Sequence, residues 1–188
     1  MATQFNPDEC LDTAVAAVSA GGKFEPVLDQ LPVPVYVTNT DGLVTYWNAA
    51  CADFAGRVPE RGQDRWCVTW QLYTTAGDRL PHDKCPMATA IKQKQPVRDQ
   101  VAIAARPDGT RVAFKPYPTP VFDADGGMVG AVNMLIDVSE QQCTALAEQA
   151  HRCRRLAGAT YDRTTCEALA AMAEGFERTS VELRRQNI

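Results

Sequence analysis

The sequence has few of the residues from which metal sites and catalytic sites are most often built, and it lacks their usual motifs. Its 188 residues include 2 histidines, and its 7 cysteines contain no CxxC pair. No GxSxG, HExxH or phosphate-binding glycine loop is present. The odd number and irregular spacing of the cysteines also disfavour a disulfide framework, so we expect most of them to be small buried side chains. We therefore expect a protein that is not an enzyme and holds no metal.

Long apolar runs and a basic balance of charge are also missing. No run approaches the roughly 18–20 apolar residues that a membrane-spanning helix needs, and the acidic N-terminus lacks the layout of a signal peptide. The formal net charge of -4 disfavours a nucleic-acid surface. Hydrophobic residues make up 45% of the chain and charged residues 22%, which is typical of a folded domain. We expect a cytoplasmic protein without a membrane or nucleic-acid partner.

Residues 1–31 are predicted to form an N-terminal helical cap. Asn6 can cap a helix, Pro7 fits its first turn, and Glu9 places negative charge at the positive end of the helix dipole. Two glycines at 21–22 end this helix. Its apolar face contains Leu11, Ala14, Val15 and Val18.

Residues 32–138 are predicted to form the main domain, an antiparallel sheet with short helices. Residues 39–42, Asn-Thr-Asp-Gly, are typical of a hairpin turn. Turns at 107–109 and 123–127 join the last three strands into a meander. In chain order the expected elements are strands at 35–38 and 43–47, a helix at 48–54, an extended segment at 70–75, a helix at 86–94, and strands at 97–105, 110–118 and 128–138.

Residues 139–188 are predicted to form a C-terminal extension of two helices. Ser139 caps the first helix, Gly158 ends it, and a capping box at 164–167 starts the second. Apolar and small residues recur at heptad spacing on both helices. The two seams are Cys143, Leu146, Ala150, Cys153 and Ala157, and Cys166, Leu169, Ala173, Phe176, Ser180 and Leu183. Two interpretations stay open, a helical hairpin within one chain and a bundle between two chains.

Residues 32–142 resemble a PAS domain at five segments that occur in the family's order. These segments are the opening hairpin at 31–42, Trp-Asn-Ala-Ala at 47–50, the turn Arg-Pro-Asp-Gly-Thr at 106–110, the last turn and strand at 123–136, and Asp-Val-Ser-Glu at 137–140. The resemblance implies an α/β (α+β) PAS fold, with a five-stranded antiparallel sheet and short helices, flanked here by N-terminal and C-terminal helices. It also implies a sensory or interaction module of bacterial signal transduction.

The end of the last strand is the expected signal junction of such a module. Asp137 and Ser139 can satisfy free N–H groups at the start of the following helix, and Glu140 adds charge at its positive end. A small shift of the strand would then rotate or tilt the helix.

The core of the predicted sheet offers an apolar lining with one or two polar groups, as a small-molecule pocket needs and as a filled core also needs. The candidates are Tyr36, Trp70, Met87, Ile91, Val101, Ile103, Phe114, Asn133 and Met134. A flavin photoreceptor is disfavoured because neither Cys67 nor Cys85 lies in an Asn-Cys-Arg-Phe-like stretch. Haem is a third reading, with His82 as the axial ligand, since residues 82–83 resemble the His-Asp stretch of oxygen-sensing haem PAS domains.

We therefore expect a sensory PAS protein that binds a small ligand or cofactor and signals through its flanking helices to a separate protein such as a kinase or regulator. We also expect a homodimer. Its candidate contact residues are Leu11, Val15, Val18, Leu146, Leu169 and Phe176. The alternatives are a ligand-free protein–protein interaction module and a haem-based gas or redox sensor.

Overall fold

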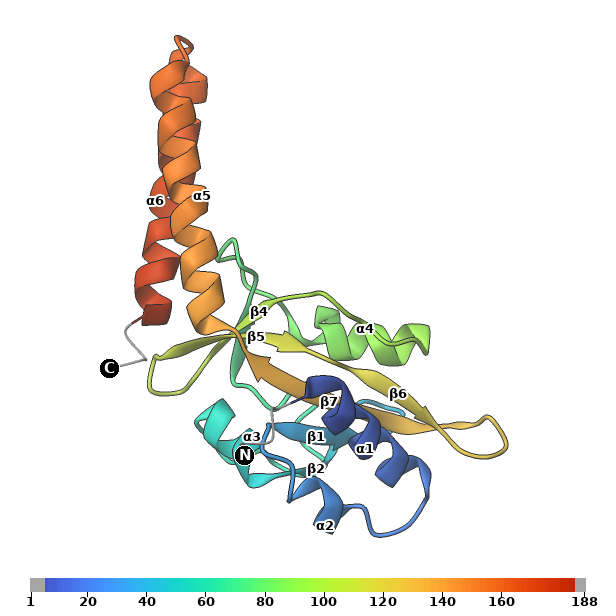
Figure 1. Cartoon of the computed structure of the whole chain (residues 1–188). Helices are drawn as coiled ribbons and strands as arrows, with labels where there is room; N and C mark the ends of the chain where they lie inside the picture. The colour runs from blue at the N-terminus through green and yellow to red at the C-terminus, as the bar shows by residue number, and fades with distance from the viewer. Residues whose placement is uncertain (1–5, 185–188) are drawn as a thin grey trace.

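A curled antiparallel sheet carries helices on both faces, and a long helical hairpin extends from one end of it (Figure 1). The computed structural model describes residues 6–184. Its elements are α1 (Pro7–Ser19), α2 (Glu25–Leu28), β1 (Val35–Thr38), β2 (Val44–Trp47), α3 (Ala49–Ala55), β3 (Gln71–Tyr73), the 3-10 turn η1 (His82–Lys84), α4 (Pro86–Gln93), β4 (Ala102–Ala105), β5 (Arg111–Pro116), β6 (Thr119–Phe122), β7 (Met128–Asp137), α5 (Ser139–Ala159) and α6 (Arg163–Arg184).

The predicted mixed class with an antiparallel sheet is confirmed, but within the described residues the sheet has seven strands rather than five. Their order is β2-β1-β7-β5-β4-β3, with β6 also paired to β7. β3 is an added edge strand, within a segment that was expected only to be extended. The strand expected at 110–118 ends at Pro116 as β5, and a further strand, β6, follows from Thr119. β5 pairs with the C-terminal part of β7, and β6 pairs with its N-terminal part.

Alternating prolines explain why the strand expected at 97–105 is short. β4 pairs with β5 from Ala102, opposite Phe114, onward. Continued in this register, residues 100 and 98 would lie opposite Pro116 and Pro118, which have no N–H to donate. The ladder therefore stops, and Asp99 adopts a positive φ of 58°.

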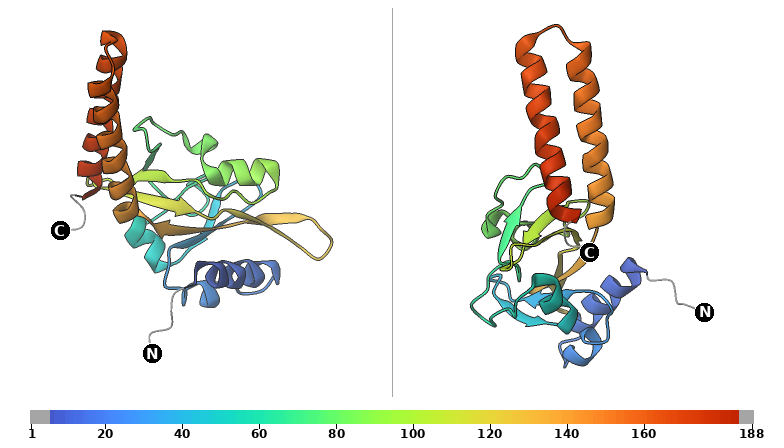
Figure 2. Two further views of the ribbon diagram at one scale, coloured as in Figure 1. Left: turned by 45° about the horizontal axis from the view of Figure 1, so that its top comes forward. Right: turned by 90° about the vertical axis from the view of Figure 1, so that its left-hand side faces the viewer.

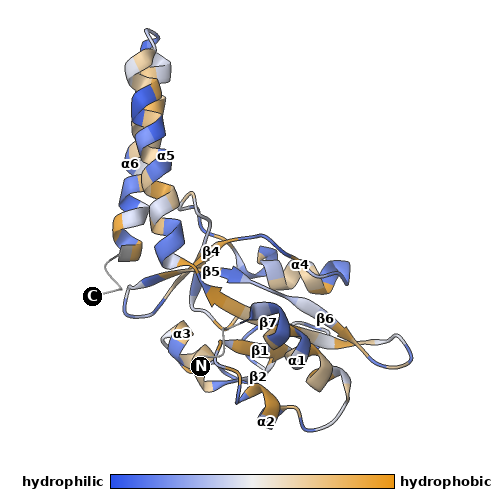
Figure 3. Cartoon of the chain, in the orientation of Figure 1, coloured by the Kyte–Doolittle hydropathy of each residue, from blue (hydrophilic) through white to orange (hydrophobic). Residues whose placement is uncertain are grey.

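The two faces of the sheet bury different clusters, because successive side chains on a strand point to opposite faces. The inner core, covered by α3 and α4, includes Tyr36, Val44, Cys51, Phe54, Cys67, Val68, Leu72, Cys85, Met87, Ala88, Ile91, Phe114 and Leu135. The outer core, covered by α1 and α2, contains Leu11, Ala14, Val18, Leu28, Val33, Val35, Val37, Tyr46, Val121, Val132 and Met134. Figure 3 shows the apolar colour on β1, β7 and α2.

The N-terminal helix forms as predicted and packs on its own chain. Asn6 Oδ1 accepts a hydrogen bond from the Asp8 N–H, and Pro7 is the first helical residue. The buried amide of Asn48 then joins the N-terminal segment to the domain. Its Oδ1 accepts from the Val35 and Cys51 N–H groups, and its Nδ2 donates to carbonyls that include that of Val33.

The seams of α5 and α6 meet each other within one chain, as the hairpin interpretation requires (Figure 2). At the base of the hairpin, Leu146 and Leu183 pack with Ile103 on the sheet. Ser180 Oγ donates to the Cys143 carbonyl at 3.3 Å. The predicted dimer residues Leu146, Leu169 and Phe176 belong to clusters of this seam, and Leu11, Val15 and Val18 contact the outer core.

Two predicted helix boundaries in the extension are wrong. Gly158 does not end α5, which continues to Ala159 and ends where Thr160 becomes extended. The predicted capping box at 164–167 does not start α6. The cap is Asp162, whose Oδ2 accepts from the Thr165 N–H at 2.8 Å, because a carboxylate one residue before the helix reaches its free N–H groups.

Candidate functional site

A chain of hydrogen bonds crosses the inner core from the loop before β3 to the last strand. The buried Tyr36 hydroxyl donates to the Trp66 carbonyl at 2.9 Å. The same oxygen accepts from Asn133 Nδ2 at 2.9 Å. Asn133 Oδ1 in turn accepts from the Tyr117 N–H at 3.0 Å, at the break between β5 and β6. These contacts, which we call the polar thread, connect β1 and β7 to the loop and to that break.

Burial keeps the groups around the polar thread in their neutral forms. It raises the pKa of Tyr36 well above its ordinary value, and the nearby thiols of Cys67 and Cys85 add to the increase. Burial also raises the pKa of the Cys51 thiol, and raises that of Cys85 to about 12. The thiolate is the reactive form of cysteine, so these side chains act as packing groups at neutral pH. The sequence-based expectation of small buried cysteines is confirmed for them.

Thr38 carries the single buried side-chain oxygen or nitrogen without a hydrogen-bond partner among residues 6–183. Thr38 is two residues beyond Tyr36 on β1, so its side chain is on the same face of the sheet. The side chain is 1% exposed. A buried hydroxyl without a partner is costly, which makes its position a candidate contact for a bound group.

The predicted pocket residues separate into four places. Tyr36, Met87, Ile91 and Phe114 belong to the inner core, and Asn133 joins them through its bond to Tyr36. The others do not share this lining.

Met134 lies in the outer core, because it follows Asn133 on β7 and so points to the opposite face. Ile103 and Val101 pack against the base of the α5–α6 hairpin. The prediction of one common lining is therefore wrong for these three residues. Trp70 is 49% exposed and lies at the surface.

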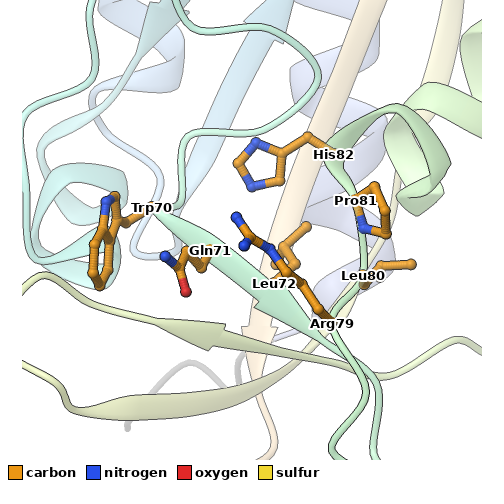
Figure 4. Close-up of a pocket in the computed structure, with 7 residues that line it drawn as sticks. All are labelled: Trp70, Gln71, Leu72, Arg79, Leu80, Pro81 and His82. Atoms are coloured by element: carbon orange, nitrogen blue, oxygen red, sulfur yellow. The ribbon is translucent and has the colours of Figure 1, made fainter.

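His82 lines a pocket that is open at the surface, which we call the outer pocket (Figure 4). The pocket has a volume of about 470 Å³ and is lined by Trp70, Gln71, Leu72, Arg79, Leu80, Pro81 and His82. Burial lowers the pKa of His82. A haem held by this imidazole would share the pocket with the polar side chains of Gln71 and Arg79, which do not form a flat apolar slot. We therefore assign no step to haem.

The signal junction is fastened to the sheet by Ser139. Its hydroxyl accepts from the Ala113 N–H of β5 at 3.0 Å, and the Asp137 carboxylate accepts from the Ser139 N–H at 2.8 Å. The prediction that Ser139 caps α5 is wrong, since it is the first helical residue and its hydroxyl bonds to the neighbouring strand. Asp137 does satisfy a free N–H, and Glu140 lies in the first turn as expected.

A sequence comparison decides the family. A family model described as PAS fold matches residues 28–142. The chain belongs to the PAS family. Such domains serve sensory signalling, and this coarse function holds for the chain.

Solved PAS and LOV structures are similar to this PAS chain. One is the PAS domain of a Colwellia psychrerythraea protein, at 17% identity, covering 60% of this chain and 92% of that chain with a TM-score of 0.45. The LOV protein of Rhodobacter sphaeroides has 14% identity, 88% and 95% coverage and a TM-score of 0.49. The LOV domain of a blue-light activated histidine kinase of Erythrobacter litoralis has 18% identity, 58% and 98% coverage and a TM-score of 0.42.

No curated protein matches the PAS chain by sequence. Within residues 6–184, no helix is long and apolar enough to span a membrane. The same residues contain no group of three or more histidine, cysteine or acidic side chains that could hold a metal ion.

Sequence reasoning missed Trp66, which closes one end of the polar thread. This residue has a positive φ of 69°, and its ring lies under the cations of Arg65 and Lys92. The ring also fills the space where a Cβ on Gly42 would lie, so the glycine is needed for close approach as well as for its φ of 81°. The glycine was a sequence signal for the turn, but nothing in the sequence named its partner.

Proposed function

We propose that this PAS chain is a bacterial cytoplasmic sensor that binds a small molecule in its inner core and signals through the α5–α6 hairpin. The observation that carries the proposal is the polar thread, because it passes through Asn133 on β7, the strand that leads directly into α5. β7 runs without interruption from Met128 through Asn133 to Asp137. A change at Tyr36 or Asn133 therefore acts on one continuous strand, which Ser139 ties to β5.

The unpaired Thr38 hydroxyl supports the ligand part of the proposal. A ligand with one hydrogen-bonding group could satisfy this oxygen and remove the cost of its burial. The apolar walls of Met87, Ile91 and Phe114 would receive the rest of the molecule. A bound group near Thr38 would also lie on the same strand and face as Tyr36, two residues away.

A tyrosine variant tests the transmission step with a matched control. Tyr36→Phe removes the hydroxyl from the polar thread, and Tyr73→Phe removes a hydroxyl whose hydrogen bond goes to Gln71 Oε1 outside it. We expect Tyr36→Phe to speed amide hydrogen exchange in the first turns of α5, whereas Tyr73→Phe leaves those turns as in the wild type. Equal exchange in the two variants would contradict transmission through the thread.

The second candidate is an interaction module without a ligand. It is favoured because Tyr36 and Asn133 already bond to each other, to the Trp66 carbonyl and to the Tyr117 N–H, and so need no ligand as a partner. Native mass spectrometry distinguishes the two. Added mass on the 20.5 kDa protomer supports the sensor, whereas its absence in protein purified directly from the producing cell favours the interaction module.

We also propose a homodimer that passes its signal to a separate kinase or regulator. Since the seam residues pack within the chain, the contact would use the outer faces of the hairpin. Leu156, Met172 and Val181 are 52%, 51% and 50% exposed there. Light scattering should give a particle of twice the protomer mass, and a particle of 20.5 kDa would contradict the dimer.

A further inference from the structure

We propose that the outer pocket binds a small, flat organic carboxylate, with Arg79 as its anion-binding residue. This site opens at the surface, borders the inner core through Leu72, and does not depend on the function proposed above. Its volume of about 470 Å³ falls within the range of about 300–1,000 Å³ that small-molecule sites occupy. The lining combines donors for an anion with an apolar wall.

Arg79 supplies the charge. Among residues 6–184, its guanidinium has no hydrogen-bond or ion-pair partner, although many other arginines of the chain are engaged. Figure 4 shows the guanidinium extending toward the space between Gln71 and His82. A guanidinium is always charged and offers a planar fork that matches a carboxylate with two parallel hydrogen bonds.

Two neutral donors converge on the same space. Burial lowers the pKa of His82, so its imidazole is neutral at physiological pH and carries one N–H. The Gln71 amide oxygen accepts from the Tyr73 hydroxyl at 2.8 Å, which leaves its NH₂ group to donate.

None of the described residues that line the pocket is acidic, so no carboxylate there competes with an anion. The nearby Asp64 is already paired with Arg57 at 2.5 Å. Asp83 is the next acidic group along η1, and it is exposed and outside the lining. Arg79 is therefore the one charged side chain of the described lining, because His82 is neutral, and it favours negative charge in the ligand.

The apolar part of the lining sets the size and shape of the ligand. Leu72, Leu80 and Pro81 form one wall, and the indole of Trp70 stands half-exposed on the other side (Figure 4). A flat aromatic body can stack on an indole, whereas an inorganic anion leaves these surfaces in water. This is why we infer an organic carboxylate rather than phosphate or sulfate.

The backbone holds the two sides of the pocket in register. β3 pairs with β4, and the chain then turns back so that the Leu80 N–H donates to the Leu72 carbonyl at 2.8 Å. The Thr74 N–H similarly donates to the Asp78 carbonyl at 2.8 Å. Arg79 and Gln71 are therefore fixed on adjacent segments, which lowers the entropic cost of binding.

The test is an NMR titration of the whole chain with benzoate, followed through the indole N–H resonances of the 3 tryptophans. A Trp70→Phe variant assigns the Trp70 signal, and Trp47 and Trp66 serve as internal references. We expect the Trp70 resonance to shift with a dissociation constant of about 1 mM or tighter. Benzamide, the neutral analogue, should bind at least about tenfold more weakly, because it lacks the charge that Arg79 recognises.

Arg79→Gln should weaken benzoate binding at least about tenfold, whereas Arg61→Gln, at an exposed arginine outside the lining, should leave it unchanged. Equal affinity in the two variants, equal affinity for benzamide, or no shift of Trp70 would overturn the proposal. Inorganic phosphate binding as tightly as benzoate would overturn the organic part. None of these results bears on the inner core, since the readout is at the surface.

Discussion

The two faces of one sheet bury different kinds of side chain. The outer core beneath α1 is formed mainly by aliphatic residues, and its one buried tyrosine, Tyr46, reaches Asp29 at the edge with its hydroxyl. The inner core contains a hydrogen-bonded tyrosine–asparagine pair and a hydroxyl without a partner. Aliphatic packing only stabilises, whereas buried polar groups are costly unless they are fully paired. The outer face therefore mainly stabilises the fold, and the inner face carries the polar groups on which the proposed sensing depends.

Substitutions at two neighbouring residues of β7 should give the largest difference in stability between the inner and outer faces. Asn133→Leu removes two hydrogen bonds and leaves the oxygen of the buried Tyr36 hydroxyl without its side-chain donor, so we expect a loss of about 2–4 kcal/mol in the free energy of unfolding. Met134→Leu conserves volume in the outer core and should cost less than about 1.5 kcal/mol. Urea unfolding measures both, and equal losses would remove the contrast between the faces.

Alkaline pH should lower the stability of the protein through the inner core, where Cys85 is buried. Because burial raises the pKa of Cys85 from 9.0 to about 12, the unfolded chain releases this proton first as the pH rises above 9. The folded state then binds more protons than the unfolded state, so stability falls with increasing pH between 9 and 12, by at most about 1.4 kcal/mol per pH unit from this group.

Cys85→Ala should reduce that slope, whereas Met134→Leu, which changes no titrating group, should retain it. Unfolding curves collected at several pH values between 9 and 11 provide the measurement. If the slope of Cys85→Ala matches that of the wild type, the thiol does not become harder to ionise on folding.

The smallest expected effect is a gain in stability on the inner face. Thr38→Val replaces the unpaired hydroxyl with a methyl group of similar shape, and should raise the free energy of unfolding by about 1 kcal/mol. Val37→Thr, the adjacent change on the outer face, buries a new hydroxyl and should lower it by about 1–3 kcal/mol. Thermal unfolding compares the pair, and a loss of stability in Thr38→Val would show that the hydroxyl already has a partner.

Local patterns were sufficient for much of the fold. Asn6 and Pro7 start α1, and the hairpin turns around Gly42 and Gly109 form with positive φ as their residues indicate. These features depend on side chains and backbone groups a few residues apart, which is why they can be predicted from the sequence. The length of β4 could not be predicted in this way, because it depends on the prolines that lie opposite it in the sheet.

The candidate site was predicted less well, for a similar reason. Tyr36, Met87, Ile91, Phe114 and Asn133 were found by their apolar or amide character, but the same criteria also selected residues on other surfaces. Assigning a residue to one face of the sheet requires the register of its strand, because a shift of one residue moves every side chain of the strand to the opposite face.

The sequence by itself determined the PAS family, the order of most of the elements and the existence of two C-terminal helices with matching seams. The tertiary structure alone decided that those seams pack against each other, that Ser139 bonds to β5, and that the Tyr36 hydroxyl meets Asn133 and the Trp66 carbonyl. Family motifs and helix periods come from neighbours along the chain, whereas these contacts join residues that are 26 to 97 positions apart. Only the folded sheet brings such residues within hydrogen-bonding distance.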